Sequence, residues 1–275
     1  MASARALGGA IPTSRTTYIG KGRGRGRGAA AGDGSPRQPG SQAGSAGTDQ
    51  RQLLGVAGIL ELLETAPPST NAESLAEQVF KEAEASINTG DEVTKFAHSL
   101  YKWTLQAPDR AKNAAIACNA VGQLERDNIK FRSPFLQTLK KDYDSRNEWK
   151  DVEETRWVSL ACLVCQFYKE FRVAGNYVAA LESPALTCIE MLLSTSSIKC
   201  HVYGIEQLCD LGPILYPKNS EKIDEMMDDL RRRLLASDTL SSSRVLFLEA
   251  LEFYAGGWEM DETAVDYYTN KKAGI

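Results

Sequence analysis

The stretch 241-SSSRVLFLEALEFYAGGW-258 decides the fold class of this chain. Large apolar side chains occupy almost the whole circumference of a helix drawn through it, so such a helix has to be covered on more than one side. The serines offer an N-cap for the first turn, and Gly256–Gly257 offers a left-handed stop. We therefore predict a core helix, in which Leu248 and Leu251 are buried.

The chain before this stretch repeats apolar side chains at helical spacing. The clearest case places Trp157, Leu160, Val164, Phe167 and Phe171 at positions i, i+3, i+7, i+10 and i+14. No segment alternates apolar and polar residues over the length of a strand. Short loops between roughly nine or ten helices indicate antiparallel hairpins stacked side by side. The predicted fold is all-α, an alpha-solenoid of about five HEAT-like hairpins over residues 49–275.

Capping residues predict where several of these helices begin and end. Asn71 precedes a helix over 72–87, and Asp109 precedes one over 110–125. Ser133-Pro134 and Ser183-Pro184 each place a capping serine before a proline that suits the first helical position. Gly212-Pro213 predicts the end of a helix that starts at residue 198, and a further helix is expected over 221–235.

Residues 1–48 form a basic arm with almost no large apolar side chains. They carry seven basic side chains against one acidic side chain, a net charge of +6. Such a segment cannot bury enough surface to offset the entropy of ordering, so we predict disorder. Its Arg-Gly repeat can hold phosphates and stack on bases, which makes Lys21, Arg23, Arg25 and Arg27 candidate RNA-binding residues with weak affinity. A solvated linker is the equally weighted alternative.

Residues 49–275 form an acidic body, with 25 basic against 35 acidic side chains and a net charge of −10. This charge repels nucleic acid on average and favours basic or amphipathic peptides. We find no run long enough to cross a membrane and no apolar core of a secretory signal, so we expect no membrane partner. The six cysteines are expected to be reduced thiols in the cytoplasm, with the nucleus left open as a second compartment.

Catalytic and metal-binding signatures are weak in this sequence. Cys162 and Cys165 form one CxxC pair on a predicted helix, and no second pair completes a zinc site. His98 and His201 lie outside any catalytic pattern. We therefore expect no enzyme, no cofactor and no metal, with the cysteines acting as small core side chains.

The end of the chain resembles the middle-domain family of eukaryotic initiation factor 4-gamma. The run LFLEALEFYAGGW, followed by Ala264-Val265-Asp266-Tyr267-Tyr268, is similar to the segment that closes this domain. Phe135-Leu136 and Phe167-Tyr168 support the match, which covers roughly residues 70–270. Within the family, the chain is most similar to the small single-domain translation adaptors, which bind the histone stem-loop-binding protein.

The resemblance implies a HEAT-like repeat without catalysis that bridges an mRNA-bound regulatory protein and the initiation factors or helicase. A direct RNA-binding protein acting through the arm is the alternative function, and a homodimer is left open. The resemblance also makes Tyr168, Phe171 and Arg172 candidates for the edge of a partner-binding groove, whereas helical periodicity alone would place the two aromatic residues in the core. Further candidates are two acids and three aromatic residues near the C-terminus, where the aromatics either anchor a partner or only cap the last hairpin: Glu249, Glu252, Trp258, Tyr267 and Tyr268.

Overall fold

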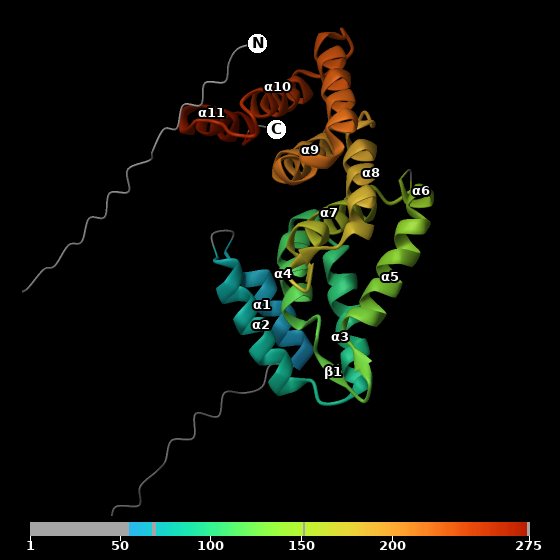
Figure 1. Cartoon of the computed structure of the whole chain (residues 1–275). Helices are drawn as coiled ribbons and strands as arrows, with labels where there is room; N and C mark the ends of the chain where they lie inside the picture. Colours follow the sequence, from blue (N-terminus) through green and yellow to red (C-terminus); the bar gives the residue numbers. More distant parts are fainter. Residues whose placement is uncertain (1–54, 68–69, 151, 274–275) are drawn as a thin grey trace, which may run out of the picture. The chain divides into compact units, whose positions relative to one another are not determined.

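Helices make up most of the part of the chain that the computed structural model describes, residues 55–67, 70–150 and 152–273 (Figure 1). The predicted arm, residues 1–48, lies outside these residues. The helices are α1 (Gly55–Thr65), α2 (Ala72–Ser86), α3 (Gly90–Thr104), α4 (Ala111–Val121), α5 (Arg132–Asp144), α6 (Arg146–Trp149), α7 (Glu154–Glu170), α8 (Glu182–Leu193), α9 (Ile198–Leu235), α10 (Ser241–Ala255) and α11 (Glu262–Lys272). Two 3₁₀ turns, η1 (Pro108–Arg110) and η2 (Ala179–Leu181), precede α4 and α8.

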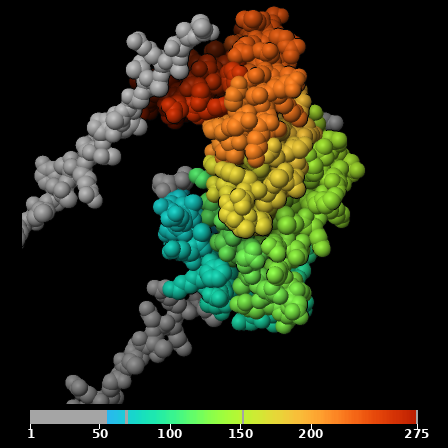
Figure 2. Space-filling view, in the orientation of Figure 1, coloured from blue at the N-terminus to red at the C-terminus, as the bar shows by residue number. Residues whose placement is uncertain are grey.

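The helices stack in sequence order, each mainly against its neighbours. α1 packs on α2, α2 on α4, α3 on α5 and α4 on α7, and the stack then continues through α8, α9, α10 and α11. The blocks of colour in Figure 2 follow one another in the same order. Because each unit contacts mainly those beside it, the arrangement is that of a helical repeat. The predicted all-α solenoid is therefore confirmed.

α7 is the central helix of the stack, because α4, α8, α9 and η1 all pack on it. Every residue from Trp157 to Tyr168 is buried. A row of aromatic rings continues the core across three helices, from Phe96 of α3 through α5 to Phe167 and Phe171 of α7, with ring centroids 4.5 to 5.8 Å apart. The strongest helical pattern in the sequence thus marks a helix that is buried over most of its length.

The predicted caps hold for some helices and fail for others. Asn71 Oδ1 accepts a hydrogen bond from the backbone N–H of Glu73 at 2.7 Å, as expected. α5 and α8 instead begin one residue before Ser133 and Ser183, and neither has a side-chain cap. α10 also lacks a serine cap, because its N-cap residue is Leu240; Ser243 lies inside the first turn, where it is buried and bonds a histidine of α9. Tertiary contacts decide these helix starts.

The predicted end of α9 at Gly212-Pro213 is wrong. The helix runs on through Pro213 and Pro217 and is interrupted at Asn219, whose φ of −133° and ψ of 31° are not helical. The Asn219 side-chain amide donates to the carbonyl of Leu215 at 3.2 Å, which is the acceptor that the backbone N–H of Asn219 would use in a regular helix. A side chain therefore replaces one backbone bond and allows the kink.

α10 buries one face rather than its whole circumference. Ser243, Leu246, Phe247 and Ala250 are buried, and α9 is the main neighbour of the helix. Leu248 is 40% exposed, so the prediction that it is a core residue is wrong. The reason is that α10 lies near the end of the stack, where α11 is the next element. The predicted stop is confirmed, because α10 ends at Ala255 and Gly257 has a φ of +72°.

Two short hairpins interrupt the helices where no strand was predicted. β1 (Glu125–Arg126) pairs with β2 (Ile129–Lys130), and β3 (Arg172–Val173) pairs with β4 (Asn176–Tyr177), both antiparallel. Each strand has two residues, too few to show an alternating pattern. Two-residue turns with positive φ connect them, at 127–128 and at 174–175.

Candidate partner-binding site

An apolar groove of about 560 Å³ lies between α5, the end of α7, the β3–β4 hairpin and the start of α8. It is within the range of sites that bind a ligand or a partner's side chains. We call it the apolar groove. Its walls are mostly aliphatic and aromatic: Arg132, Leu136, Leu139, Lys140, Tyr143, Asp144, Val164, Phe167, Phe171, Val173, Val178, Ala180, Leu181 and Pro184.

One of the predicted residues at the end of α7, Phe171, belongs to a wall of this groove. Phe171 is the C-cap residue of α7, and its ring stacks on that of Phe167 at 4.5 Å. Phe171 is buried within the wall, whereas Val173 on the hairpin is 46% exposed and faces the same groove. The chain turn after α7 thus places an apolar hairpin beside an apolar helix.

Tyr168 and Arg172 hold the hairpin in place. Tyr168 is buried and its hydroxyl donates to Glu182 at 3.2 Å. Burial, together with the negative charge of Glu182, raises the pKa of Tyr168 to about 12. The Arg172 guanidinium donates to the carbonyls of Tyr168 and Phe171 and lies 3.6 Å from the ring centre of Tyr177. These two side chains position the groove edge from behind it.

Charged side chains at the rim complete the groove. Lys140 forms an ion pair with Asp144 at 2.5 Å, while Arg132 forms no ion pair among the described residues. An apolar floor with a cation at its edge suits one face of an amphipathic helix.

The C-terminal candidates separate into buried and exposed side chains. Trp258 packs against the rings of Tyr216, Phe253 and Tyr254, with ring centres 5.6 to 5.9 Å apart. Tyr268 is buried, and burial raises its pKa, with a hydrogen bond to Glu252 adding to the rise. These contacts make both residues part of the last hairpin.

Tyr267 is the aromatic side chain that faces solvent there, with 54% of its surface exposed. Glu252 is exposed as well. Glu249 is largely buried and bonds Lys272 at 2.6 Å. The structure therefore does not gather all the predicted residues into one site. It forms one surface around the end of α7 and another on α10 and α11, while Lys21, Arg23, Arg25 and Arg27 lie outside the described residues.

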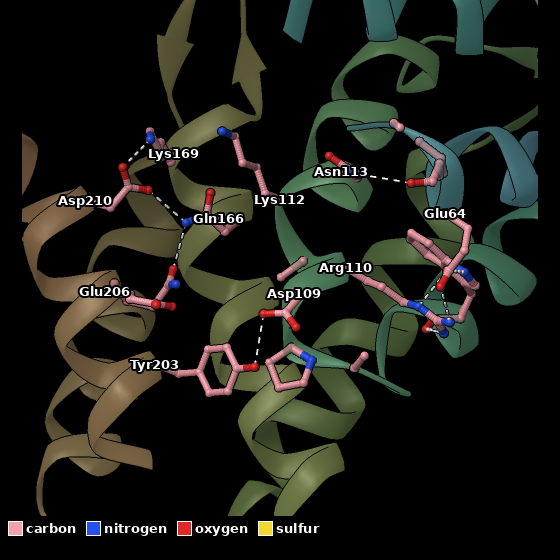
Figure 3. Close-up of a pocket in the computed structure, with 17 residues that line it drawn as sticks. Glu64, Asp109, Arg110, Lys112, Asn113, Gln166, Lys169, Tyr203, Glu206 and Asp210 are labelled. Atoms are coloured by element: carbon pink, nitrogen blue, oxygen red, sulfur yellow. Dashed lines mark hydrogen bonds and ion pairs between the residues drawn. The ribbon is translucent and has the colours of Figure 1, made fainter. Parts of the chain in front are cut away.

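A third feature, which the sequence did not predict, is a polar hollow of about 720 Å³ (Figure 3). It lies between α1, the turn before α4, α7 and α9. Asp109, expected to cap a helix, lines it and accepts a hydrogen bond from the Tyr203 hydroxyl at 3.0 Å. Gln166 lies on its floor. A single amide inside the apolar run of α7 was the one sequence signal for this hollow.

The structure buries several of the cysteines and histidines that were singled out in the sequence. Cys162 and Cys165 are buried, and burial raises the pKa of both thiols. Within 55–67, 70–150 and 152–273 no cluster of three potential ligands could hold a metal ion. His201 is buried between Ser243 and the carbonyl of Thr195. None of the helices in these residues is long and apolar enough to cross a membrane.

Comparison with known proteins finds that the chain is similar to MIF4G domain-containing proteins. No family model matches it. It is 29% identical over 192 residues to MIF4G domain-containing protein A of Danio rerio, covering 66% of this chain and 88% of that protein. It is 30% identical over 168 residues to protein B of the same organism, covering 58% and 74%. A CBP80/20-dependent translation initiation factor of Xenopus tropicalis is 24% identical over 197 residues, a third of its length.

Proposed function

The chain belongs to the family of MIF4G domain-containing proteins, and on that premise we propose that it is a non-enzymatic adaptor in mRNA translation. MIF4G is the middle-domain type of initiation factor 4-gamma, so the resemblance drawn from the C-terminal run is confirmed. The observation that carries the proposal is the extent of the similarity, which spans 88% of a relative built around this domain. A more distant relative is named as a translation initiation factor.

The adaptor would link an mRNA-bound regulatory protein, of the histone stem-loop-binding type, to initiation factors or their helicase. Two separate surfaces support this role, because bridging needs two simultaneous contacts. The apolar groove suits a partner helix with apolar anchors, and α10 with α11 presents Tyr267 and Glu252. We place the protein in the cytoplasm, with entry into the nucleus and self-association as open parts of the proposal.

A tethering experiment tests the role. The full chain is fused to an RNA-hairpin-binding coat protein and recruited to a reporter mRNA that carries the hairpins. We expect more reporter protein per mRNA than with the coat protein alone. Leu136→Asp places a charge in the apolar groove and is expected to abolish the increase, whereas Gln137→Asp, on the neighbouring exposed position, is expected to preserve it.

Thermal melting of both variants is the necessary control, since Leu136 is partly buried. A tethered chain that leaves the ratio of reporter protein to mRNA unchanged contradicts the adaptor role. If Leu136→Asp and Gln137→Asp are equally active, the role stands and the groove is not the docking surface.

Direct RNA binding through the arm is the second candidate function. The net charge of +6 on residues 1–48, against −10 on the rest, favours it. The two functions are compatible, since an arm that holds RNA weakly would keep an adaptor near its message.

A further inference from the structure

The polar hollow contains more carboxylates than its own cations neutralise. Two pairs are internal: Arg110 bonds Glu64 at 2.8 Å, and Lys169 bonds Asp210. Asp109 and Glu206 also line the hollow, and neither forms an ion pair among the described residues. Lys112 is the remaining cation of the lining, exposed and without an ion pair in the same residues. Two carboxylates therefore face one lysine, and the hollow stays acidic.

The surroundings of Glu206 relieve this acidity only in part. The residue is exposed at the mouth, yet burial of its carboxylate raises its pKa; Lys272 lowers it, while the charges of Asp109 and Glu249 raise it further. Lys272 already bonds Glu249 at 2.6 Å. Asp109 and Glu206 are thus close enough to repel each other, and a cation between them would remove the repulsion.

Gln166 supplies a second and independent observation. Its side chain is only 5% exposed, and its amide nitrogen donates to Gln207 at 2.8 Å and to Asp210 at 2.9 Å. Since a carboxylate can only accept at this pH, the nitrogen must face Asp210, and this fixes the orientation of the amide. The oxygen then points away from α9 (Figure 3), is buried, and has no hydrogen-bond partner among the described residues. The floor thus presents an acceptor without a donor.

We propose that the polar hollow binds the guanidinium of an arginine side chain from a basic segment, with Asp109 and Glu206 supplying the opposite charge and Gln166 the acceptor on the floor. A guanidinium carries five N–H groups in one plane, so it can serve a carboxylate and an amide oxygen together. It also stays charged in a partly buried site. This inference does not depend on the role in translation.

The arginine can come from this chain or from a partner. Arg23, Arg25 and Arg27 belong to a basic segment of the chain itself, and 27 residues separate Arg27 from Gly55, where α1 begins. Leu63 and Glu64 near the end of α1 line the hollow. The same chemistry would also accept a basic peptide of another protein.

Calorimetric titration of the full chain at physiological salt tests the site. The probe is a blocked peptide with the sequence of residues 20–28, beside a copy in which citrulline replaces each arginine. We expect the arginine peptide to bind and the citrulline peptide, which has the same shape without the charge, to fail. Glu206→Gln should weaken binding at least about fivefold, while Glu77→Gln, an equal charge change on an exposed site of α2 outside the hollow, should not.

Gln166→Leu adds a test of the floor acceptor, read together with its melting temperature because Gln207 and Asp210 lose their donor. Equal affinities for Glu206→Gln and Glu77→Gln, or equal binding of the citrulline peptide, would overturn the proposal. The full chain carrying Arg23→Gln, Arg25→Gln and Arg27→Gln identifies the source. Tighter binding of the added peptide by this variant shows that the arm occupies the hollow, and unchanged binding shows that the arm does not compete for it.

Discussion

The six-membered ring of Trp258 lies so close to the backbone of Gly212 that a methyl group there would be 2.1 Å from Cζ3 of the indole. Glycine at this point of α9 therefore makes room for the residue that follows α10. Trp258 itself has a φ of +69°, which is unfavourable for a residue with a side chain. Packing against Tyr216 and Tyr254 compensates for that strain.

Gly212→Ala is expected to lower the free energy of unfolding by about 1–3 kcal/mol, because the indole must move. Chemical denaturation of the full chain measures this change. The double variant Gly212→Ala/Trp258→Ala supplies the control, since removal of the indole removes the clash. Additive losses in the double variant would show that the two residues do not compete for the same space.

Phe247→Ala and Leu248→Ala, on adjacent positions of α10, should differ widely in their cost. Phe247 is fully buried, and its truncation is expected to cost about 3–5 kcal/mol. Leu248 is 40% exposed, so its truncation should cost less than about 1 kcal/mol. The denaturant midpoints of the two variants, compared with that of the unaltered chain, measure these two losses of stability. A loss for Leu248→Ala comparable to that for Phe247→Ala would mean that another surface covers α10.

Tyr267→Ala is expected to leave the melting temperature unchanged and to weaken partner binding by about 2 kcal/mol, as an exposed aromatic anchor would. Tyr268→Ala is the matched comparison, one residue away but buried, and should lower the melting temperature. A partner is first captured from a cell extract on the immobilised full chain, and its affinity for each variant is then measured. Full affinity of Tyr267→Ala would leave α11 with a purely structural role.

Acidification should destabilise the protein through His201. Burial lowers the pKa of this histidine below 6.5, and the positive charge of Arg233 acts in the same direction. The native ring is therefore neutral where the unfolded chain already binds a proton. Its contribution to stability is complete above about pH 6.5 and is lost as pH falls through the lower native pKa.

Unfolding free energies of the unaltered chain and of His201→Gln, measured from pH 7.5 to 5, test this linkage. The slope with pH should be smaller in the variant. His98→Gln, an exposed histidine, serves as the control and should keep the original slope. Parallel curves for the unaltered chain and His201→Gln would contradict the assignment.

The arm should bind RNA weakly and with a steep dependence on salt. Replacing Arg23, Arg25 and Arg27 with alanine removes three phosphate contacts, so the slope of log affinity against log salt should fall by about 2–3. Filter binding at several salt concentrations measures the slope, and the melting temperature should not change. Equal slopes for both proteins would favour the linker interpretation.

The sequence was sufficient for the helices that repeat apolar residues over several turns, and α7 is the clearest case. It was insufficient where the deciding contact comes from a distant part of the chain. Gly212-Pro213 resembles a helix end, but the glycine serves Trp258, 46 residues later, and the helix continues. Ser243 resembles a capping residue, but its hydroxyl bonds His201. Capping and helix-stop patterns predict where an isolated helix would begin and end, and packing against distant residues changes these positions in the folded chain.

The sequence predicted the candidate surfaces only in part, as it did the helix ends. The end of α7 does border an apolar groove, yet α5 supplies its opposite wall with residues, such as Leu139 and Tyr143, that were assigned no partner-binding role. Helical periodicity predicts that Tyr168 and Phe171 lie in the core. Only the neighbouring elements determine which of the two lines a groove. The polar hollow was missed because its residues come from α1, α4, α7 and α9.

The order of stacking has a consequence for how the domain comes apart. In a linear array, the terminal unit is held from one side only, and α11 packs mainly on α10. The backbone amides of α11 should therefore exchange hydrogen with solvent sooner than those of α7, because the array unfolds locally from its end. A protein that binds α10 and α11 together would suppress this local unfolding and would slow hydrogen exchange at Tyr268 and Trp258 together.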